Sequence, residues 1–252
     1  EKVVVVSNNA KTLGMLHQLA KEGDNVSIEV DSSEVLASIG SQNQDGTINS
    51  FTKVDSTAKK WSLSKEVEEG ENGPGDFDLL FTDLAGNPGI NVDYTSDGSH
   101  LIFDTKDPIL TDVSLASNNL ETSQAKEGDN LTLSLSSDEP IELSQVTLAG
   151  NTIPVIEDVS DNGTEWEVSI LVDQNTPENQ ATFSVAFNDE AGNQGTTQTI
   201  TKDRSVVNID TTPPIMDRVR LQSNNPIHTL AMGEDQITLN FDVSEFIETT
   251  II

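Results

Sequence analysis

The sequence predicts an all-β chain of tandem immunoglobulin-like β-sandwich domains joined by short linkers that contain proline. Stretches with an apolar residue at every second position recur along the chain, and turn-forming residues separate them, as in a sandwich of about seven short strands. Only Leu13 to Lys21 has helix-like character. The whole pattern returns once per small domain, which predicts a string of similar domains.

Short motifs mark this repeat. Their positions in successive repeats differ by 105 to 110 residues, which is the length of one small domain. Repetition of a whole domain usually supplies reach, stiffness or multivalency rather than a single catalytic centre. The motifs are Ser-Asn-Asn at 7–9, 117–119 and 223–225, Ala-Gly-Asn at 85–87 and 191–193, Asp-Thr at 104–105 and 210–211, and Trp61 with Trp166.

The repeat divides the chain into three segments. Residues 1–107 form a first immunoglobulin-like repeat, whose first strand we expect to be truncated, and residues 108–213 form a second. Residues 214–252 begin a third repeat, whose two strand-like runs cannot enclose a core by themselves. Proline stiffens the linkers Asp104–Pro108 and Asp210–Pro214, so we expect the domains to form a rod.

The second repeat has the clearest strands. Their period-two alternation is typical of strands that bury one face in a sandwich. Trp61 and Trp166 are in phase with the inward-facing residues, which predicts that both fill cores rather than stack on a ligand. The runs are Leu131 to Leu135, Trp166 to Val172 and Ala181 to Phe187, followed by a last extended stretch from Thr196 to Ile209.

The chain is strongly acidic, with 13 basic and 43 acidic residues and a formal net charge of −30. Such a charge repels nucleic acid and anionic membranes, so we expect neither as a partner. No apolar run approaches the roughly 20 residues that span a bilayer, which predicts no membrane insertion. Self-repulsion of this size destabilises a compact fold, and bound divalent cations would offset it.

Patterns typical of enzymes are missing from the sequence. The three histidines are scattered, none is paired with a repeated Ser or Asp, and there is no HExxH, nucleophile elbow or phosphate-binding loop. The sequence has no cysteine, so disulfides and thiol chemistry play no part. We therefore expect a protein that is not an enzyme.

Acidic loops are predicted to meet where two repeats join. In an immunoglobulin-type sandwich alternate loops lie at opposite ends, so loops of one repeat face loops of the next across the linker. Several carboxylates with amide and carbonyl oxygens suit Ca²⁺, which takes about 6–8 oxygen ligands. The predicted ligands are Asp24, Asp104, Asp107, Glu139, Asp189 and Asn193 at the first junction, and Asp129, Asp210 and Glu245 at the second.

Two loops and one linker resemble a known family. Phe81–Asn87 and Phe187–Asn193 are similar to the D-x-A-G-N loop of bacterial immunoglobulin-like (BIg-type) tandem repeats, and Ile209–Pro214 is similar to their D-T-T-x-P boundary. The resemblance implies the stalk of a large surface adhesin or secreted fibrous protein, with Ca²⁺ at the domain junctions. It also implies that the foremost ligands are Asp104, Asp210, Asp189, Glu139 and Glu245.

We therefore expect a structural extender of a large extracellular or cell-surface protein, stiffened by Ca²⁺ and carrying a distal surface ligand site outside this segment. Its neighbouring repeats are its first partners. Three alternatives remain open. A module that binds a glycan or a protein needs an exposed aromatic or apolar patch. A filament subunit would complete its third repeat with strands from other copies. An accessory domain of a secreted enzyme would leave catalysis to another part of the protein.

Overall fold

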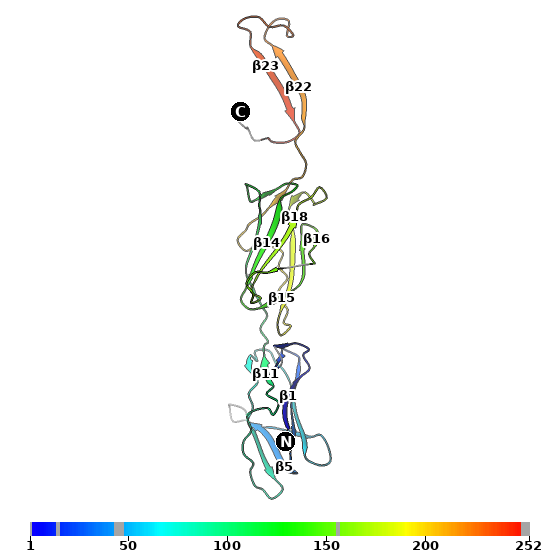
Figure 1. Cartoon of the computed structure of the whole chain (residues 1–252), viewed down its shortest axis with the longest axis vertical. Helices are drawn as coiled ribbons and strands as arrows, with labels where there is room; N and C mark the ends of the chain where they lie inside the picture. The colour runs from blue at the N-terminus through cyan, green and yellow to red at the C-terminus, as the bar shows by residue number, and fades with distance from the viewer. Residues whose placement is uncertain (1, 14–15, 43–47, 155–156, 248–252) are drawn as a thin grey trace.

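The computed structural model describes residues 2–13, 16–42, 48–154 and 157–247, and the regular elements among them are all β-strands. Within these ranges no helix could cross a membrane. Strands pair only with strands of the same repeat, so three sets of sheets follow one another along the chain. They lie end to end, and the molecule is elongated (Figure 1). The fold is all-β, with tandem immunoglobulin-like sandwiches.

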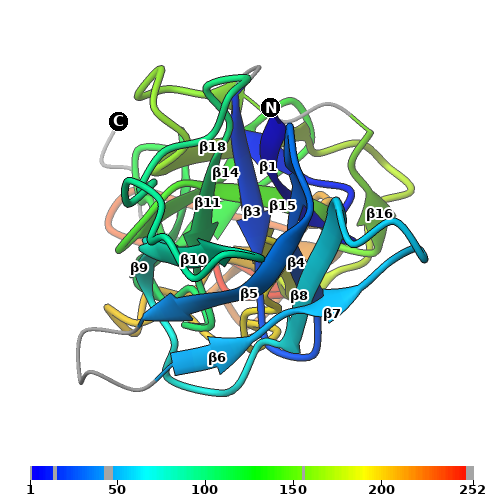
Figure 2. The ribbon, with the colours of Figure 1, turned by 90° about the horizontal axis from the view of Figure 1, so that it is seen from below.

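The first repeat forms three sheets around its core, seen end-on in front of the rest of the molecule in Figure 2. The first sheet contains, in spatial order, β1 (Lys2–Ser7), β4 (Asn25–Asp31), β8 (Lys60–Glu66) and β7 (Thr52–Lys53). The second contains β10 (Leu79–Asp83), β5 (Leu36–Gln42) and β6 (Ile48–Ser50), and the third contains β2 (Thr12–Leu13), β3 (His17–Ala20), β11 (His100–Phe103) and β9 (Gly73–Pro74).

The second repeat follows the same plan. Its first sheet contains β12 (Leu110–Ser117), β14 (Asn130–Ser137), β18 (Glu165–Leu171) and β17 (Glu157–Asp158). The other two contain β16 (Asn151–Thr152), β15 (Ile141–Leu148) and β20 (Phe183–Asp189), and β13 (Gln124–Ala125), β21 (Asn208–Ile209) and β19 (Asn179–Gln180). Corresponding strands therefore have corresponding partners in both repeats, as duplication of one domain requires.

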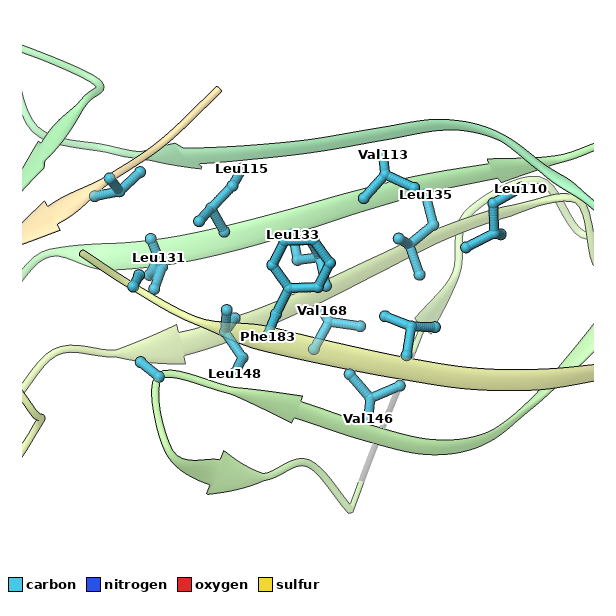
Figure 3. Packing of buried hydrophobic residues seen from close by; sticks show 14 of the residues in the cluster. Leu110, Val113, Leu115, Leu131, Leu133, Leu135, Val146, Leu148, Val168 and Phe183 are labelled. Atoms are coloured by element: carbon cyan, nitrogen blue, oxygen red, sulfur yellow. The ribbon is translucent and has the colours of Figure 1, made fainter. Parts of the chain in front are cut away.

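The core of the second repeat follows from its alternating strands. Leu131, Leu133 and Leu135 of β14 are 0%, 0% and 2% exposed, while the Thr and Ser between them are half-buried. Antiparallel pairing with β18 places Val168 opposite Leu133, and Phe183 enters the same cluster from the facing sheet (Figure 3). Burial of each such side chain contributes about 1.5–3 kcal/mol, so the apolar face of each strand decides its orientation.

The two tryptophans lie at corresponding positions in the two repeats and help to fill their cores. Trp61 is 6% exposed, and Trp166 packs against the core of the second repeat. Each indole nitrogen has a backbone acceptor, because Trp61 Nε1 donates to the Ala58 carbonyl at 3.1 Å and Trp166 Nε1 donates to the Gly163 carbonyl at 3.2 Å. Both tryptophans therefore have the structural role that their position in the strand pattern predicts.

Two stretches of the first and second repeats differ from their sequence patterns. The described part of Leu13 to Lys21 is extended rather than helical: β2 pairs with β3, and β3 pairs parallel to β11. This pairing buries Leu19 and Ala20 in the first repeat, which an exposed helical turn would not do. The stretch from Thr196 to Ile209 forms a regular strand only at its last two residues.

The third repeat is a hairpin of β22 (Met216–Ser223) and β23 (Ile237–Val243) within the described residues. Two strands alone cannot enclose a core. Its apolar side chains are accordingly exposed, including Val219 at 61%, Leu221 at 67% and Leu239 at 55%.

Candidate metal centre at the first domain junction

The linker between the first two repeats is attached to both of them. On the first repeat, Asp104 N donates to the Ala20 carbonyl at 2.9 Å, and Thr105 N donates to Asn72 Oδ1 at 2.9 Å. On the second, Ile109 N donates to Asp138 Oδ1 at 2.8 Å. Only residues 106–108 lie between these anchors, so the relative position of the two domains depends on a very short segment.

A tight loop follows β20 and fixes Asp189 at the junction. Gly192 takes a φ of +92°, which strongly favours glycine. The turn lets Gly192 N and Asn193 N donate to Asp189 Oδ1 at 2.7 and 2.8 Å, while Asn193 Nδ2 donates to Asp189 Oδ2 at 2.7 Å. Asp189 is therefore a rigidly held carboxylate, only 1% exposed, at the end of a buried strand.

The same loop holds the linker. Asn193 Nδ2 also donates to the Asp104 backbone carbonyl at 2.8 Å, which ties the linker to the second repeat. Asp104, Glu139 and Asp189 each offer a carboxylate oxygen within 4.8 Å of the others, and they form a group capable of holding a metal ion within the described part of the chain. The three residues come from the linker, from the turn between β14 and β15, and from the end of β20.

The electrostatics of this group favour a cation. Burial raises the pKa of the Asp189 carboxyl above its usual range even though Asn193 hydrogen-bonds to the charged form, and the nearby Asp104 adds to the rise. Burial also raises the pKa of Glu139, as do the charges of Asp104 and Asp189. Glu139 Oε1 is buried and has no hydrogen-bond partner among the described residues. Such carboxylates are stabilised in their charged form by a bound cation.

Lys106 is the one basic side chain that pairs with this group in the structure as described. Its Nζ lies 2.7 Å from Asp138 Oδ2 and 3.7 Å from Glu139 Oε1, and the side chain is 60% exposed. Burial opposes ionisation of Asp138, but the hydrogen bonds from Lys106 and Ile109 outweigh it and hold the pKa of Asp138 below its usual range. Lys106 therefore mainly neutralises Asp138 and only partly compensates Glu139.

Further contacts cross the junction beside the carboxylates. Asn9 Nδ2, in the loop after β1, donates to the Ala191 carbonyl of the second repeat at 2.9 Å and to Asp24 Oδ2 at 2.7 Å. Lys11 Nζ lies 2.5 Å from Glu142 Oε2, which forms an exposed ion pair between the two repeats. The carboxylate group therefore belongs to a wider interface and not to a free linker.

The other residues predicted for the first junction lie outside the carboxylate group. Asp107 is exposed. Asp24 closes its own loop, because its Oδ2 accepts hydrogen bonds from Asn9 Nδ2 and from the Lys21 amide at 2.7 and 2.8 Å. Asn193 lies at the site and orients both Asp189 and the linker.

The residues predicted for the second junction are not brought together within the described residues. Asp129 repeats the role of Asp24: its Oδ2 accepts from Asn119 Nδ2 at 2.7 Å, and this bond is the main cause that lowers the pKa of Asp129. Asp210 Oδ1 accepts from the Thr212 amide at 3.0 Å and is exposed. Glu245 is half-buried and joins no such group.

Two contributors were missed from the sequence, Asn9 and Lys106. The recurring Ser-Asn-Asn motif was a signal for Asn9, since its last residue bonds an Asp in each repeat: Asn9 to Asp24, Asn119 to Asp129, and Asn225 to Asp235. No repeat marks Lys106, because Thr212 stands at the corresponding place in the next linker.

The donor set fits a hard divalent cation. Three carboxylates supply up to about six oxygens at the short distances that Ca²⁺ prefers, and they contribute no nitrogen or sulfur of the kind preferred by softer metals. The ligands would be Asp104, Glu139 and Asp189. Each comes from a separate segment, so a cation held by all three would join the linker to two loops of the second repeat.

Comparison with known proteins identifies no family for this chain. No family model matches the sequence, and no curated protein matches it. Among solved structures, the fibronectin(III)-like modules of Clostridium thermocellum CbhA match 82% of this chain and 95% of their own at 14% identity, with a TM-score of 0.34. A titin immunoglobulin tandem matches 84% and 97% at 12% identity, with a TM-score of 0.27.

Murine CEACAM1b is a further structural neighbour, with 12% identity, 76% of this chain and 96% of its own covered, and a TM-score of 0.32. These neighbours are fibronectin III-like and immunoglobulin-like proteins. At such low scores and identities they carry no information about the function of this chain.

Proposed function

We propose that this chain is a stalk segment of a large extracellular or cell-surface, adhesin-like protein of the bacterial immunoglobulin-like repeat type, stiffened by Ca²⁺ at the first junction. The observation that carries the proposal is the group Asp104, Glu139 and Asp189, whose carboxylate oxygens lie within 4.8 Å of one another. The three residues belong to the linker and to two loops of the next repeat. A cation bound there acts on the angle between domains rather than on a substrate.

The reason is electrostatic. Without a cation, three carboxylates repel one another, and among the residues that the structure describes only Lys106, at 3.7 Å from Glu139, partly compensates them. Repulsion favours arrangements in which the linker swings Asp104 away from the second repeat. A bound Ca²⁺ reverses this preference, because each carboxylate is then attracted to the same ion. The ion would therefore select the straight arrangement in which Asn193 holds the linker carbonyl.

The end-to-end arrangement supports a mechanical role. The sandwiches follow one another along the long axis (Figure 1), and the first junction is crossed by the Asn9 and Lys11 contacts as well as by the linker. A series of such domains extends a distal part of a protein away from its base, and each stiff junction preserves that reach.

Thermal unfolding with millimolar Ca²⁺ and with excess chelator tests the proposal. A ligand that binds only the folded state at about 100 times its Kd stabilises it by about 2.7 kcal/mol. For domains of this size we expect the unfolding midpoint to rise by about 10 °C in Ca²⁺. Equal concentrations of Mg²⁺ should raise it less, because Mg²⁺ dehydrates reluctantly and demands a stricter octahedral geometry. Identical midpoints in Ca²⁺ and chelator would contradict the proposal.

A further inference from the structure

A cavity of about 650 Å³ lies within the first repeat, away from the junction carboxylates. It opens among the three sheets of that repeat, and its apolar wall includes Val5, Ile28, Leu63 and Leu101. The buried residues of this repeat fall into two clusters, which are bridged by partly buried residues such as Ile28 and Phe77. The buried residues of the second repeat form one continuous cluster.

The second repeat shows why the first one is hollow. Leu79 of β10 corresponds to Val185 of β20 in the second repeat. Leu79 pairs with Ser41, whereas Val185 pairs with Val146, which is 1% exposed. A buried valine is thus replaced by a smaller, polar side chain on the cavity wall.

The facing strand contains a second exchange. Lys65 pairs with Val26 of β4, where the second repeat pairs Ile170 with Leu131. Lys65 Nζ lies over the Phe103 ring at 5.3 Å and forms an ion pair with Glu71, so its charged end turns to the cavity rim instead of filling the core. In a third exchange Gly75 replaces Ala181. Gly75 N donates to the Leu101 carbonyl as Ala181 N donates to the Val207 carbonyl. The exchanges at Ser41 and Lys65 remove apolar volume on two sides of one space, whereas a Cβ at Gly75 would meet the Leu101 side chain at 3.0 Å.

The polar side of the cavity consists mainly of acceptors. Among its described lining residues Glu71, Asp76 and Asp78 are acidic, and Lys65, which is already paired with Glu71, is the single basic one. The half-buried Asp78 carboxylate accepts a hydrogen bond from Asn91 Nδ2 at its Oδ2, at 3.3 Å, whereas its Oδ1 has no hydrogen-bond partner among the described residues. The second repeat has Ser184 at this position, so the carboxylate is specific to the hollow repeat.

We propose that this cavity binds an organic ammonium ion with an apolar body. The ammonium charge offsets the excess of two negative charges in the lining, to which Asp78 contributes one carboxylate, while the apolar body covers Ile28, Leu63 and Leu101. The volume lies within the range of about 300–1,000 Å³ that is usual for small-molecule sites. The site is independent of Ca²⁺ at the junction, and the proposal holds whether or not the chain is a stalk.

Calorimetric titration with three related probes tests this assignment, with Ca²⁺ kept constant at a saturating level. We expect phenethylammonium to bind saturably at millimolar concentrations or below. The neutral 2-phenylethanol and the small ethylammonium should each bind at least about tenfold weaker. The first lacks the positive charge, and the second lacks the apolar ring. Equal affinity for phenethylammonium and 2-phenylethanol would refute the role of Asp78, and no saturable binding of phenethylammonium would refute the site.

Two variants that borrow residues from the second repeat make the test specific. Asp78→Ser removes a carboxylate from the lining and should weaken phenethylammonium binding at least about tenfold, and Ser41→Val narrows the cavity and should weaken binding less. Ser41→Val should also raise the unfolding temperature of the first repeat, which shows that the loss of binding is not a loss of folding. Glu167→Gln, at an exposed position of β18 in the second repeat, should bind the probe as the parent does. Unchanged affinity in both cavity variants would overturn the proposal.

Discussion

Glu139→Gln is expected to abolish most of the stabilisation that Ca²⁺ confers on this chain. Glu139 Oε1 accepts no hydrogen bond among the described residues, so the substitution breaks no hydrogen bond at that oxygen while it removes one charged ligand. If affinity falls about 100-fold, stabilisation at the same Ca²⁺ concentration drops from about 2.7 to about 0.4 kcal/mol. The Ca²⁺-dependent rise in the midpoint should then shrink from about 10 °C to one or two degrees. Scanning calorimetry in Ca²⁺ and in chelator measures both values.

The chain offers a matched control for this variant. Glu34 occupies the corresponding turn of the first repeat: Ser32 Oγ donates to the Glu34 carbonyl as Ser137 Oγ donates to the Glu139 carbonyl. Glu34 belongs to no group of metal-binding side chains in the described residues. Glu34→Gln should therefore leave the Ca²⁺ response unchanged. A full response in Glu139→Gln, or an equal loss in Glu34→Gln, would remove Glu139 from the site.

Opposite pH dependences are expected with and without Ca²⁺. The pKa values of Asp189 and Glu139 are raised in the folded chain, mainly by burial and then by neighbouring carboxylates, so the folded state binds these protons more tightly than the unfolded state. In chelator, the contribution of these two carboxyls to the free energy of unfolding should increase as the pH falls through their raised pKa values. It should level off below about pH 4. In Ca²⁺ the same protons compete with the ion for the carboxylates. The stabilisation that Ca²⁺ confers should therefore be lost as the pH falls over the same range.

Other carboxylates oppose this trend, so the test needs a difference measurement. Asp129 and Asp138 have lowered pKa values, and their contributions weaken as the pH falls. Subtracting the free energy of unfolding of Glu139→Gln from that of the parent at each pH removes most of their effect. The parent-minus-variant difference should grow as the pH falls in chelator and shrink in Ca²⁺. The same slope in both conditions would contradict coupled proton and metal binding at this group.

The alternation of residues predicted the sandwich of each repeat well, because burial of one strand face is a local property of the sequence. Leu131, Leu133 and Leu135 are buried as that pattern indicates. The helix-like stretch from Leu13 to Lys21 was misleading, because the parallel pairing of β3 with β11 joins segments about 80 residues apart. Local pattern contains no information about such a partner.

Individual site residues were harder to predict than the junction. Asp24 and Asp104 lie in equally acidic, loop-like contexts, yet the structure uses Asp24 to accept the bonds of its own loop and places Asp104 beside Glu139 and Asp189. The difference depends on where the linker leaves β11 and how Asn193 holds it, and both are properties of the assembled domains. Likewise, the cavity could be recognised only after the register had aligned Ser41 with Val146.

The distance between the first two repeats tests the central claim most directly. The chain has no cysteine, so Ser64→Cys and Glu167→Cys, both at exposed positions of β8 and β18, allow two spin labels to be attached without further changes. Pulsed electron spin resonance should give a narrow distance distribution in Ca²⁺ and a broad one, shifted to shorter distances, in chelator. Glu139→Gln should give the broad distribution in both. A narrow, unchanged distribution of the parent in chelator would show that the junction is stiff without a metal and would contradict the account.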